Sequence, residues 1–415
     1  MKRSVAVCVG EDAAEAGTLA YEFRGQRRSV SFAYADSWLA SPQRFALSPD
    51  LPLVSGHQFR AARDAGQSAF FGCFADTEPD GWGRMVILRD HARQGKDRLQ
   101  GQSPAGMLDD FDFLLGVNDF SRSGALRLRD GQAGFLRPSG GPRDTPPLIE
   151  LPRLLSASKA VEENRETARD LEFLRGNGTS LGGLRPKCSI IDADGSLAIG
   201  KFPSVQDTRS VVHGEVLALH LARAAGIDAA KARVELSGKI PVAVISRFDR
   251  ADGRRLMYLS ARSLMDAAPA RQHSYVDIAD AIRMHSSQAA ADLAELWRRM
   301  VLNILINNID DHLVNHGFLH QEHGQWRLAP AFDINPFPDK ARSLKTWISP
   351  EAGDGASIAQ ALAAARYFGL SAATAQSMLD EVRFAVVNWK GIARDVGMGA
   401  VDIERFAPAF AHPEL

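Results

Sequence analysis

Residues 306–336 restrict the fold of this chain more than any other segment, because they require a short β-ribbon between acidic positions. An apolar stretch with helical spacing leads to Asp310, and Asn315 follows five residues later. Two strand-like runs joined by a His-Gly turn then lead directly into Asp333. The segment therefore predicts a helix, a loop and a β-hairpin, with carboxylate and amide side chains gathered around the hairpin.

These side chains are of the types that phosphoryl transfer uses. We predict that the helix spans 292–309, so that Asp310 lies at its end, where a carboxylate can receive a hydroxyl proton. The spacing from Asp310 to Asn315 is the D-x-x-x-x-N of a phosphoryl-transfer loop, and a carboxylate at the end of the hairpin can hold Mg²⁺ opposite the asparagine. The predicted metal ligands are Asn315 and Asp333.

A glycine-rich segment upstream supplies the matching phosphate-binding elements. Residues 176–187, GNGTSLGGLRPK, are followed by two predicted strands, 188–191 and 197–202, and the second strand carries Lys201. Glycines let main-chain N–H groups approach phosphate oxygens, and a lysine on the returning strand can reach the phosphates of a nucleotide.

Glu215 opens a helical pattern, GEVLALHLARAAG, which Gly226 ends. Two interpretations remain open for this glutamate. It can pair with Lys201 to orient ATP, or it can be a solvated surface residue, as most glutamates are.

The order of these motifs resembles that of the HipA-like serine/threonine kinases, the toxin half of bacterial HipBA toxin–antitoxin modules, over nearly the whole chain. TSLGGLRPK resembles the family's phosphate loop, IGKF carries its nucleotide lysine, VAVISRFDR resembles the strand and hinge beside the adenine, and IDDHLVN and AFDI carry its catalytic and metal aspartates. The resemblance places the catalytic aspartate on Asp310 rather than Asp311, and a regulatory autophosphorylated serine on Ser180. It implies that the nucleotide is lined by Gly182, Gly183, Leu184, Arg185, Lys187, Lys201, Glu215, Ser246, Arg247, Phe248, His312, Asn315 and Asp333.

The first third of the chain resembles, in five blocks of the same order, the small β-rich domain that precedes the kinase core in this family. The blocks include AGTLAYE, FAYADSWLA and FLLGVNDFSRSGALRL, whereas FADTEPDGWGR departs from the commoner Leu-Pro-Glu/Asp-Gly phrase. We expect an α+β chain with a protein-kinase-like, HipA-type fold. Its expected parts are a β-rich domain over 1–136 with one helix at 81–93, a linker over 137–148, a mixed α/β nucleotide lobe over 149–250 and a mostly helical catalytic lobe over 251–415.

The resemblance also implies an activity and partners. These are transfer of the γ-phosphoryl group of ATP, with Mg²⁺, to a serine or threonine of another protein, and inactivation by autophosphorylation at Ser180. The implied substrate is an aminoacyl-tRNA synthetase, with glutamyl-tRNA synthetase first. The implied partner is a HipB-like helix-turn-helix antitoxin, through which alone the chain would meet DNA.

Composition agrees with an intracellular enzyme. The net charge is only -1, which does not favour direct nucleic-acid binding. No apolar stretch reaches the length of a membrane span or of a secretory signal, so we expect a cytoplasmic protein without membrane contact. Cys8, Cys73 and Cys188 lie far apart, without metal-ligand spacing, and are expected to be packing residues.

Other interpretations of these motifs are weaker. Four histidines, His312, His316, His320 and His323, lie close together, but the predicted helix exit between them argues against a shared zinc ion. The chain has no Gly-x-Ser-x-Gly elbow of a serine hydrolase. Two further alternatives are a non-catalytic, nucleotide-binding co-repressor, which should lack a catalytic group, and a small-molecule phosphotransferase, which should lack the amino-terminal blocks.

Overall fold

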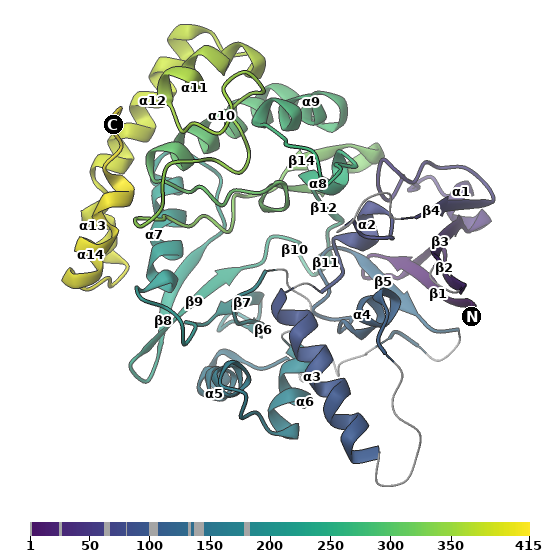
Figure 1. Ribbon diagram of the computed structural model, residues 1–415. Helices are drawn as coiled ribbons and strands as arrows, with labels where there is room; N and C mark the ends of the chain where they lie inside the picture. Colours follow the sequence, from purple (N-terminus) through teal and green to yellow (C-terminus); the bar gives the residue numbers. More distant parts are fainter. Residues whose placement is uncertain are drawn as a thin grey trace. The chain divides into compact units, whose positions relative to one another are not determined.

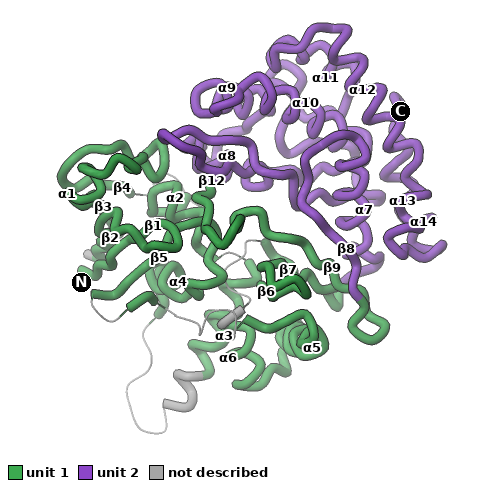
Figure 2. Tube along the Cα trace, turned by 180° about the vertical axis from the view of Figure 1, so that it is seen from behind, with its two compact units in different colours: residues 1–206, 236–258 green, residues 207–235, 259–415 purple. Residues whose placement is uncertain are grey.

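The computed structural model describes residues 2–24, 27–61, 67–79, 81–98, 107–131, 134–136, 145–177 and 183–415. The chain forms two compact units, one of residues 1–206 and 236–258 and the other of residues 207–235 and 259–415 (Figure 2). The sequence-based boundaries at 136 and 250 divide the chain more finely than this, and they remain predictions.

The first unit begins with a five-stranded antiparallel sheet. Its strands are β1 (Lys2–Val9), β2 (Ala14–Arg24), β3 (Arg27–Tyr34), β4 (His57–Arg60) and β5 (Leu126–Arg129), in the order β4-β3-β2-β1-β5. Buried and open positions alternate along β5, which shows that one face of this strand is turned to the core. The β-rich character expected for this part of the chain is confirmed.

The expectation of a single helix in this part is wrong. The helix expected at 81–93 is α3 (Gly81–Arg98), and three short helices accompany it: α1 (Asp36–Ala40), α2 (Gly72–Ala75) and α4 (Asp110–Gly116). Helix α4 starts with a capping box, in which Asp109 and Asp112 each accept a hydrogen bond from the other's main-chain N–H. Because aspartate is also common in turns, the presence of Asp109 and Asp112 did not by itself predict so short a helix.

A second sheet carries the nucleotide motifs. Its strands are β6 (Lys187–Ile191), β7 (Leu197–Lys201), β9 (Ile240–Ser246) and β8 (Ala232–Ser237), in the order β6-β7-β9-β8. The β6–β7 hairpin turns at Asp192 and Gly195, whose φ of 83° suits glycine. The η2 turn (Leu148–Glu150) and the helices α5 (Leu151–Glu162) and α6 (Ala168–Asn177) precede the hairpin, and the strands β10 (Arg250–Ala251) and β11 (Arg254–Arg255) follow the sheet (Figure 1).

The second unit is mostly helical, as expected. Its helices are α7 (Val211–Ala224), α8 (Ala261–Leu264), α9 (Tyr275–His285), α10 (Ala289–Leu305), α11 (Ile358–Ala364), α12 (Ala372–Val387), α13 (Trp389–Asp395) and α14 (Ala400–Phe406), with 3-10 turns η3 (Leu313–Asn315), η4 (Glu322–Gly324), η5 (Ala365–Phe368) and η6 (Ala407–Phe410). A small sheet, β12 (Tyr258–Ser260), β13 (Gly317–His320) and β14 (Trp326–Leu328), contains the predicted hairpin. Ser371 caps α12 through the N–H of Thr374, as predicted.

The helix that leads to Asp310 is shorter than predicted. Helix α10 ends at Leu305, not Ile309, because Asn307 takes a left-handed conformation with φ of 54° and the N–H of Asn308 turns back to the carbonyl of Asn303. Asp310 therefore lies in a loop beyond the helix.

The three cysteines are buried and free, which confirms their packing role. Within the described residues, no helix combines the length and the apolar character needed to cross a membrane.

Candidate functional site

The end of the glycine-rich loop is described from Gly183 onwards, whereas Ser180 and Gly182 lie outside the described residues. Gly183 has φ of 96°, and a Cβ atom on it would come within 2.4 Å of the Lys187 Nζ atom. Leu184 is largely exposed and Arg185 is half-buried. The main chain of the loop end is thus turned sharply, with the ammonium group of Lys187 directly beside it.

The two lysines predicted to neutralise phosphate charge face each other in one hairpin. Lys187 at the start of β6 pairs in register with Lys201 at the end of β7. Lys187 is buried, whereas Lys201 is half-buried. Antiparallel register therefore brings both ammonium-bearing residues to the end of the hairpin that adjoins the glycine-rich loop.

The hinge residues Ser246 and Phe248 are half-buried, but Arg247 between them is buried and its guanidinium group is engaged. It donates to Asp249 Oδ1 at 2.8 Å and to the carbonyls of Ser121 at 2.6 Å and Arg122 at 3.3 Å. The Arg247 side chain therefore connects the hinge to residues 121–122. Only its main chain remains for the predicted contact with a nucleotide, which stays a prediction.

Asp310, the predicted catalytic base, is held from two sides in the second unit. His312 Nε2 lies 3.0 Å from its carboxylate, and Asn315 Nδ2 donates to its main-chain carbonyl at 3.3 Å. About half of the Asp310 side chain is exposed, at 53%. A carboxylate oriented in this way and still open to solvent is available to a substrate hydroxyl.

The contact between these two side chains shifts both pKa values. The hydrogen bond to Asp310 raises the pKa of His312 above its ordinary 6.5, and the same bond lowers the pKa of Asp310 below its ordinary 3.8. Asp310 is consequently ionised at neutral pH, and His312 keeps its positive charge to a higher pH than a free histidine would.

We predict a pH dependence of nucleotide affinity from this pair. The charge of His312 is complete below pH 6.5 and is lost as the pH rises through the raised pKa, so MgATP should bind a few-fold more weakly at alkaline pH, a modest change because the pair is half exposed. Titration of MgATP at several pH values checks this. A His312→Gln protein that shows the same pH dependence would contradict the assignment.

Asp311, the neighbour of Asp310, is the centre of a buried network. Its carboxylate accepts hydrogen bonds from the Tyr275 hydroxyl and from Asn303 Nδ2 at 3.1 Å, and lies 2.8 Å from His316 Nε2. Its main-chain carbonyl accepts from the Thr346 hydroxyl at 2.6 Å. Sequence reasoning missed this role. The available signal was Asn303, an amide within the apolar surface of α10.

A continuous chain of hydrogen bonds runs from this network to the predicted metal aspartate. Asn303 Oδ1 accepts from Asn308 Nδ2 at 3.0 Å, and Asn308 Oδ1 accepts from the N–H of Asn335 at 3.2 Å. Asn335 Nδ2 in turn donates to Asp333 Oδ1 at 3.3 Å. Asp333 itself has φ of 55°, a conformation that aspartate tolerates better than most residues. The segments that carry the two predicted functional aspartates are therefore connected by side-chain amides.

A magnesium ion fits the donors that the sequence assigned to it. Asn315 uses its amide nitrogen on Asp310, so its amide oxygen is the atom suited to a cation, and Asp333 adds a carboxylate. One or two protein oxygens completed by phosphates and water are typical of Mg²⁺. Among the described residues there is no group of three or more His, Cys, Asp or Glu side chains that could hold a metal by itself.

Glu215 is buried within α7, which begins at Val211, before the position predicted from the sequence. The solvated-surface interpretation is thus wrong. The pairing of Glu215 with Lys201 remains a prediction.

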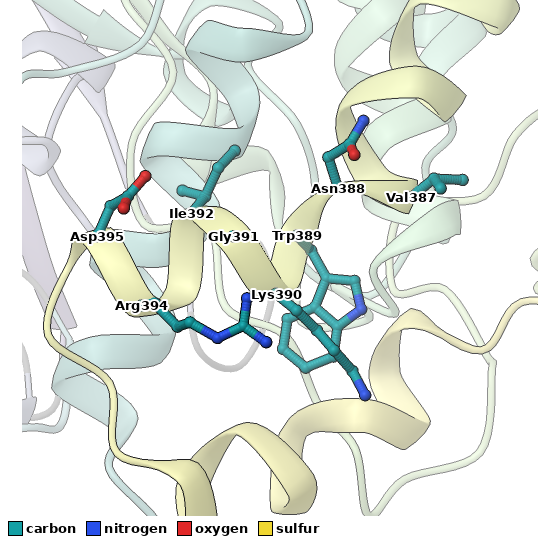
Figure 3. Close-up of a pocket in the computed structure, with 8 residues that line it drawn as sticks. All are labelled: Val387, Asn388, Trp389, Lys390, Gly391, Ile392, Arg394 and Asp395. Atoms are coloured by element: carbon teal, nitrogen blue, oxygen red, sulfur yellow. The ribbon is translucent and has the colours of Figure 1, made fainter.

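Two surface hollows, of about 530 Å³ and about 510 Å³, lie on the carboxyl-terminal helices. The second is formed by residues 387–392, 394 and 395, and Figure 3 shows these residues on α13 and the end of α12. Neither hollow includes a residue predicted to bind a nucleotide or to act on a substrate.

Comparison with known proteins identifies relatives of both parts of the chain. The profile of the HipA-like C-terminal domain matches residues 179–389, and that of the HipA N-terminal domain matches residues 7–108. The solved HipA–HipB–operator DNA complex of the Shewanella oneidensis MR-1 toxin–antitoxin system includes a chain similar in fold, with a TM-score of 0.64 and 14% identity, over 98% of this chain and 96% of that chain.

Two further matches cover less of this chain. A putative kinase of Haemophilus influenzae is 26% identical over 187 residues, 39% of this chain, and the match spans only 54% of that relative. The Helicobacter pylori proinflammatory kinase CtkA reaches a TM-score of 0.37 at 14% identity, over 54% of this chain and 92% of that chain, which is too low to establish a common fold.

Proposed function

This chain belongs to the HipA-like family, and from that premise we propose that it is an ATP-dependent serine/threonine protein kinase of the HipA type. The arrangement around Asp310 supports the proposal most strongly. A half-exposed, ionised carboxylate is oriented by His312, and Asn315 donates to the main-chain carbonyl of the same residue. A relay of amides connects this loop to Asp333. Kinase chemistry requires this combination of a base and a metal-binding carboxylate held in a fixed relation.

The proposed mechanism assigns a role to each of these residues. Asp310 orients the substrate hydroxyl and accepts its proton. The amide oxygen of Asn315 and the carboxylate of Asp333 would hold Mg²⁺. Lys187, Lys201 and the loop amides neutralise the charge of the phosphates. Mg²⁺, when bound, supplies positive charge to the β- and γ-phosphate oxygens.

The first test concerns the metal. Replacing Asp333 by Ala removes the proposed carboxylate ligand, so MgATP affinity and its dependence on Mg²⁺ concentration should both fall, while the affinity for metal-free ADP changes little. Calorimetric titration with and without Mg²⁺ measures both. Asn335→Ala is the matched control, because it loses the hydrogen bond to Asp333 and keeps the carboxylate. An unchanged Mg²⁺ dependence in Asp333→Ala would place the ion elsewhere.

The second test concerns regulation at Ser180. We propose that the kinase phosphorylates this serine and thereby inactivates itself, because about -1.5 to -2 charges in the glycine-rich loop repel the phosphates of ATP. Mass spectrometry after incubation with ATP should find the modification in the wild-type protein and not in Asp310→Asn. An active enzyme whose Ser180 stays unmodified would refute self-inactivation at this position.

The cellular role is proposed from the family. The chain would act in the cytoplasm as the toxin of a toxin–antitoxin module, with a HipB-like helix-turn-helix antitoxin as partner and an aminoacyl-tRNA synthetase, such as glutamyl-tRNA synthetase, as substrate. The solved Shewanella complex of HipA, HipB and operator DNA supports the antitoxin part. Quantitative phosphoproteomics after induced expression, with Asp310→Asn as the reference, identifies the substrate.

A further inference from the structure

Helix α3 belongs to the amino-terminal profile match, yet its apolar residues complete a core that includes residues of β6 and β7. Trp82 and Val86 are fully buried in one cluster with residues of β6, β7 and β9, among them Ile190, Ala198 and Val244. The cluster also includes residues of α5 and α6, and α3 packs against α6 (Figure 1). A helix from the first third of the sequence is thus an integral part of the nucleotide-binding core.

Polar contacts fix the middle of α3 to the same core. Arg89 Nη1 donates to the Val161 carbonyl at 2.7 Å and lies 3.1 Å from the Glu166 carboxylate. One residue further, the buried Asp90 forms an ion pair with Arg175 of α6. The helix therefore has little freedom to move relative to the sheet.

The first residues of α3 touch the end of the glycine-rich loop. The N–H of Trp82 donates to the Gly183 carbonyl at 3.0 Å. At Gly81 an added Cβ would lie 2.6 Å from the Gly183 oxygen and 2.9 Å from the Leu184 Cα, so only glycine allows this approach. Initial helix N–H groups have no partner within the helix, and here one of them holds the loop.

We infer that Gly81 and Trp82 are positioning residues of the nucleotide site: they hold the main chain at Gly183 and Leu184 in the form that binds phosphate. The inference rests on the proposed function, because it assigns the loop to phosphate binding. A loop that is ordered before the ligand arrives binds more tightly, because less conformational entropy is lost on binding. By reciprocity, a bound nucleotide stabilises the start of α3.

The variant Gly81→Ala tests the contact. Its methyl group must displace the Gly183 main chain, so the dissociation constant for MgATP should rise about tenfold, while kcat at saturating ATP stays near that of the wild type. Gly56→Ala is the matched control, because both glycines have a positive φ, 34° at Gly81 and 87° at Gly56, but an added Cβ at Gly56 would meet nothing within 4 Å. Equal weakening in both variants would attribute the effect to backbone strain and overturn the inference.

Hydrogen–deuterium exchange gives a second measurement that requires no catalysis. In the nucleotide-free protein, Gly81→Ala should speed exchange at Trp82 and at residues 183–185 relative to Gly56→Ala, and unchanged exchange overturns the inference. If the wild type binds no MgATP, the proposed function fails, and the exchange comparison still decides whether α3 holds the loop. Should Gly81→Ala not fold, wild-type exchange decides: MgATP must slow exchange at Trp82, and a bound nucleotide without that effect refutes the link.

Discussion

Replacement of Asp310 by Asn should reduce phosphoryl transfer by about 100-fold or more, the loss typical of removing a general base. Asparagine keeps the volume of the side chain and cannot accept the proton. About half of the Asp310 side chain is exposed, and its partner His312 is similarly open, so the free energy of unfolding should change little. Initial rates of phosphate incorporation at saturating ATP measure the activity, and nucleotide titration shows that ATP still binds.

A control separates this effect from a general loss of surface charge. Asp252→Asn makes the same change at a side chain that is 87% exposed in the first unit, and its rate should equal that of the wild type. Full turnover by Asp310→Asn would refute the assignment of Asp310 as the base.

Replacement of the adjacent Asp311 by Ala should mainly lower the stability of the protein, whereas Asp310→Asn mainly lowers its activity. The change leaves Tyr275, Asn303 and His316 without their shared acceptor in a buried site. Leaving buried donors unsatisfied costs about 1–3 kcal/mol each, so we expect the free energy of unfolding to fall by about 3 kcal/mol or more. Activity should fall as well, since this network supports the Asp310 loop. Urea unfolding followed by circular dichroism measures the change.

The two neighbouring aspartates provide a mutual control. Asp310→Asn should remove activity and keep stability, whereas Asp311→Ala should remove stability first. If Asp311→Ala proves as stable as the wild type while Asp310→Asn unfolds readily, the assignment of the base and the buried anchor is reversed.

The hairpin of β13 and β14 could be predicted because its determinants are local. His323 and Gly324 both take positive φ, and a His-Gly pair between two alternating runs is a turn signal. The β6–β7 hairpin could be predicted for the same reason, from the turn at Asp194 and Gly195. The end of α10 could not be predicted in this way. Apolar spacing continues to Ile309, but the left-handed conformation of Asn307 is stabilised by bonds from its side chain to the carbonyls of Phe337 and Lys340, which are distant in sequence.

The sequence predicted the candidate functional residues, but not the side chains that form hydrogen bonds around them. Asp310, Asn315 and Asp333 follow from spacing and from the family resemblance, whereas the buried role of Asp311 depends on Tyr275 and Asn303, which reach it only after α9 and α10 have packed. Arg247 shows the same limit. Its hinge position could be predicted, but not that its side chain is engaged by residues 121–122.

The packing of α3 limits where the protein can be truncated. A fragment beginning at residue 149 would retain the glycine-rich loop, both lysines and every predicted catalytic residue, yet it would lack Trp82 and Val86. The apolar side chains of β6, β7, α5 and α6 that these two residues cover would then face water. We therefore expect that the segment carrying α3 cannot be removed without destabilising the rest of the first unit, because the core around β6 and β7 includes its side chains.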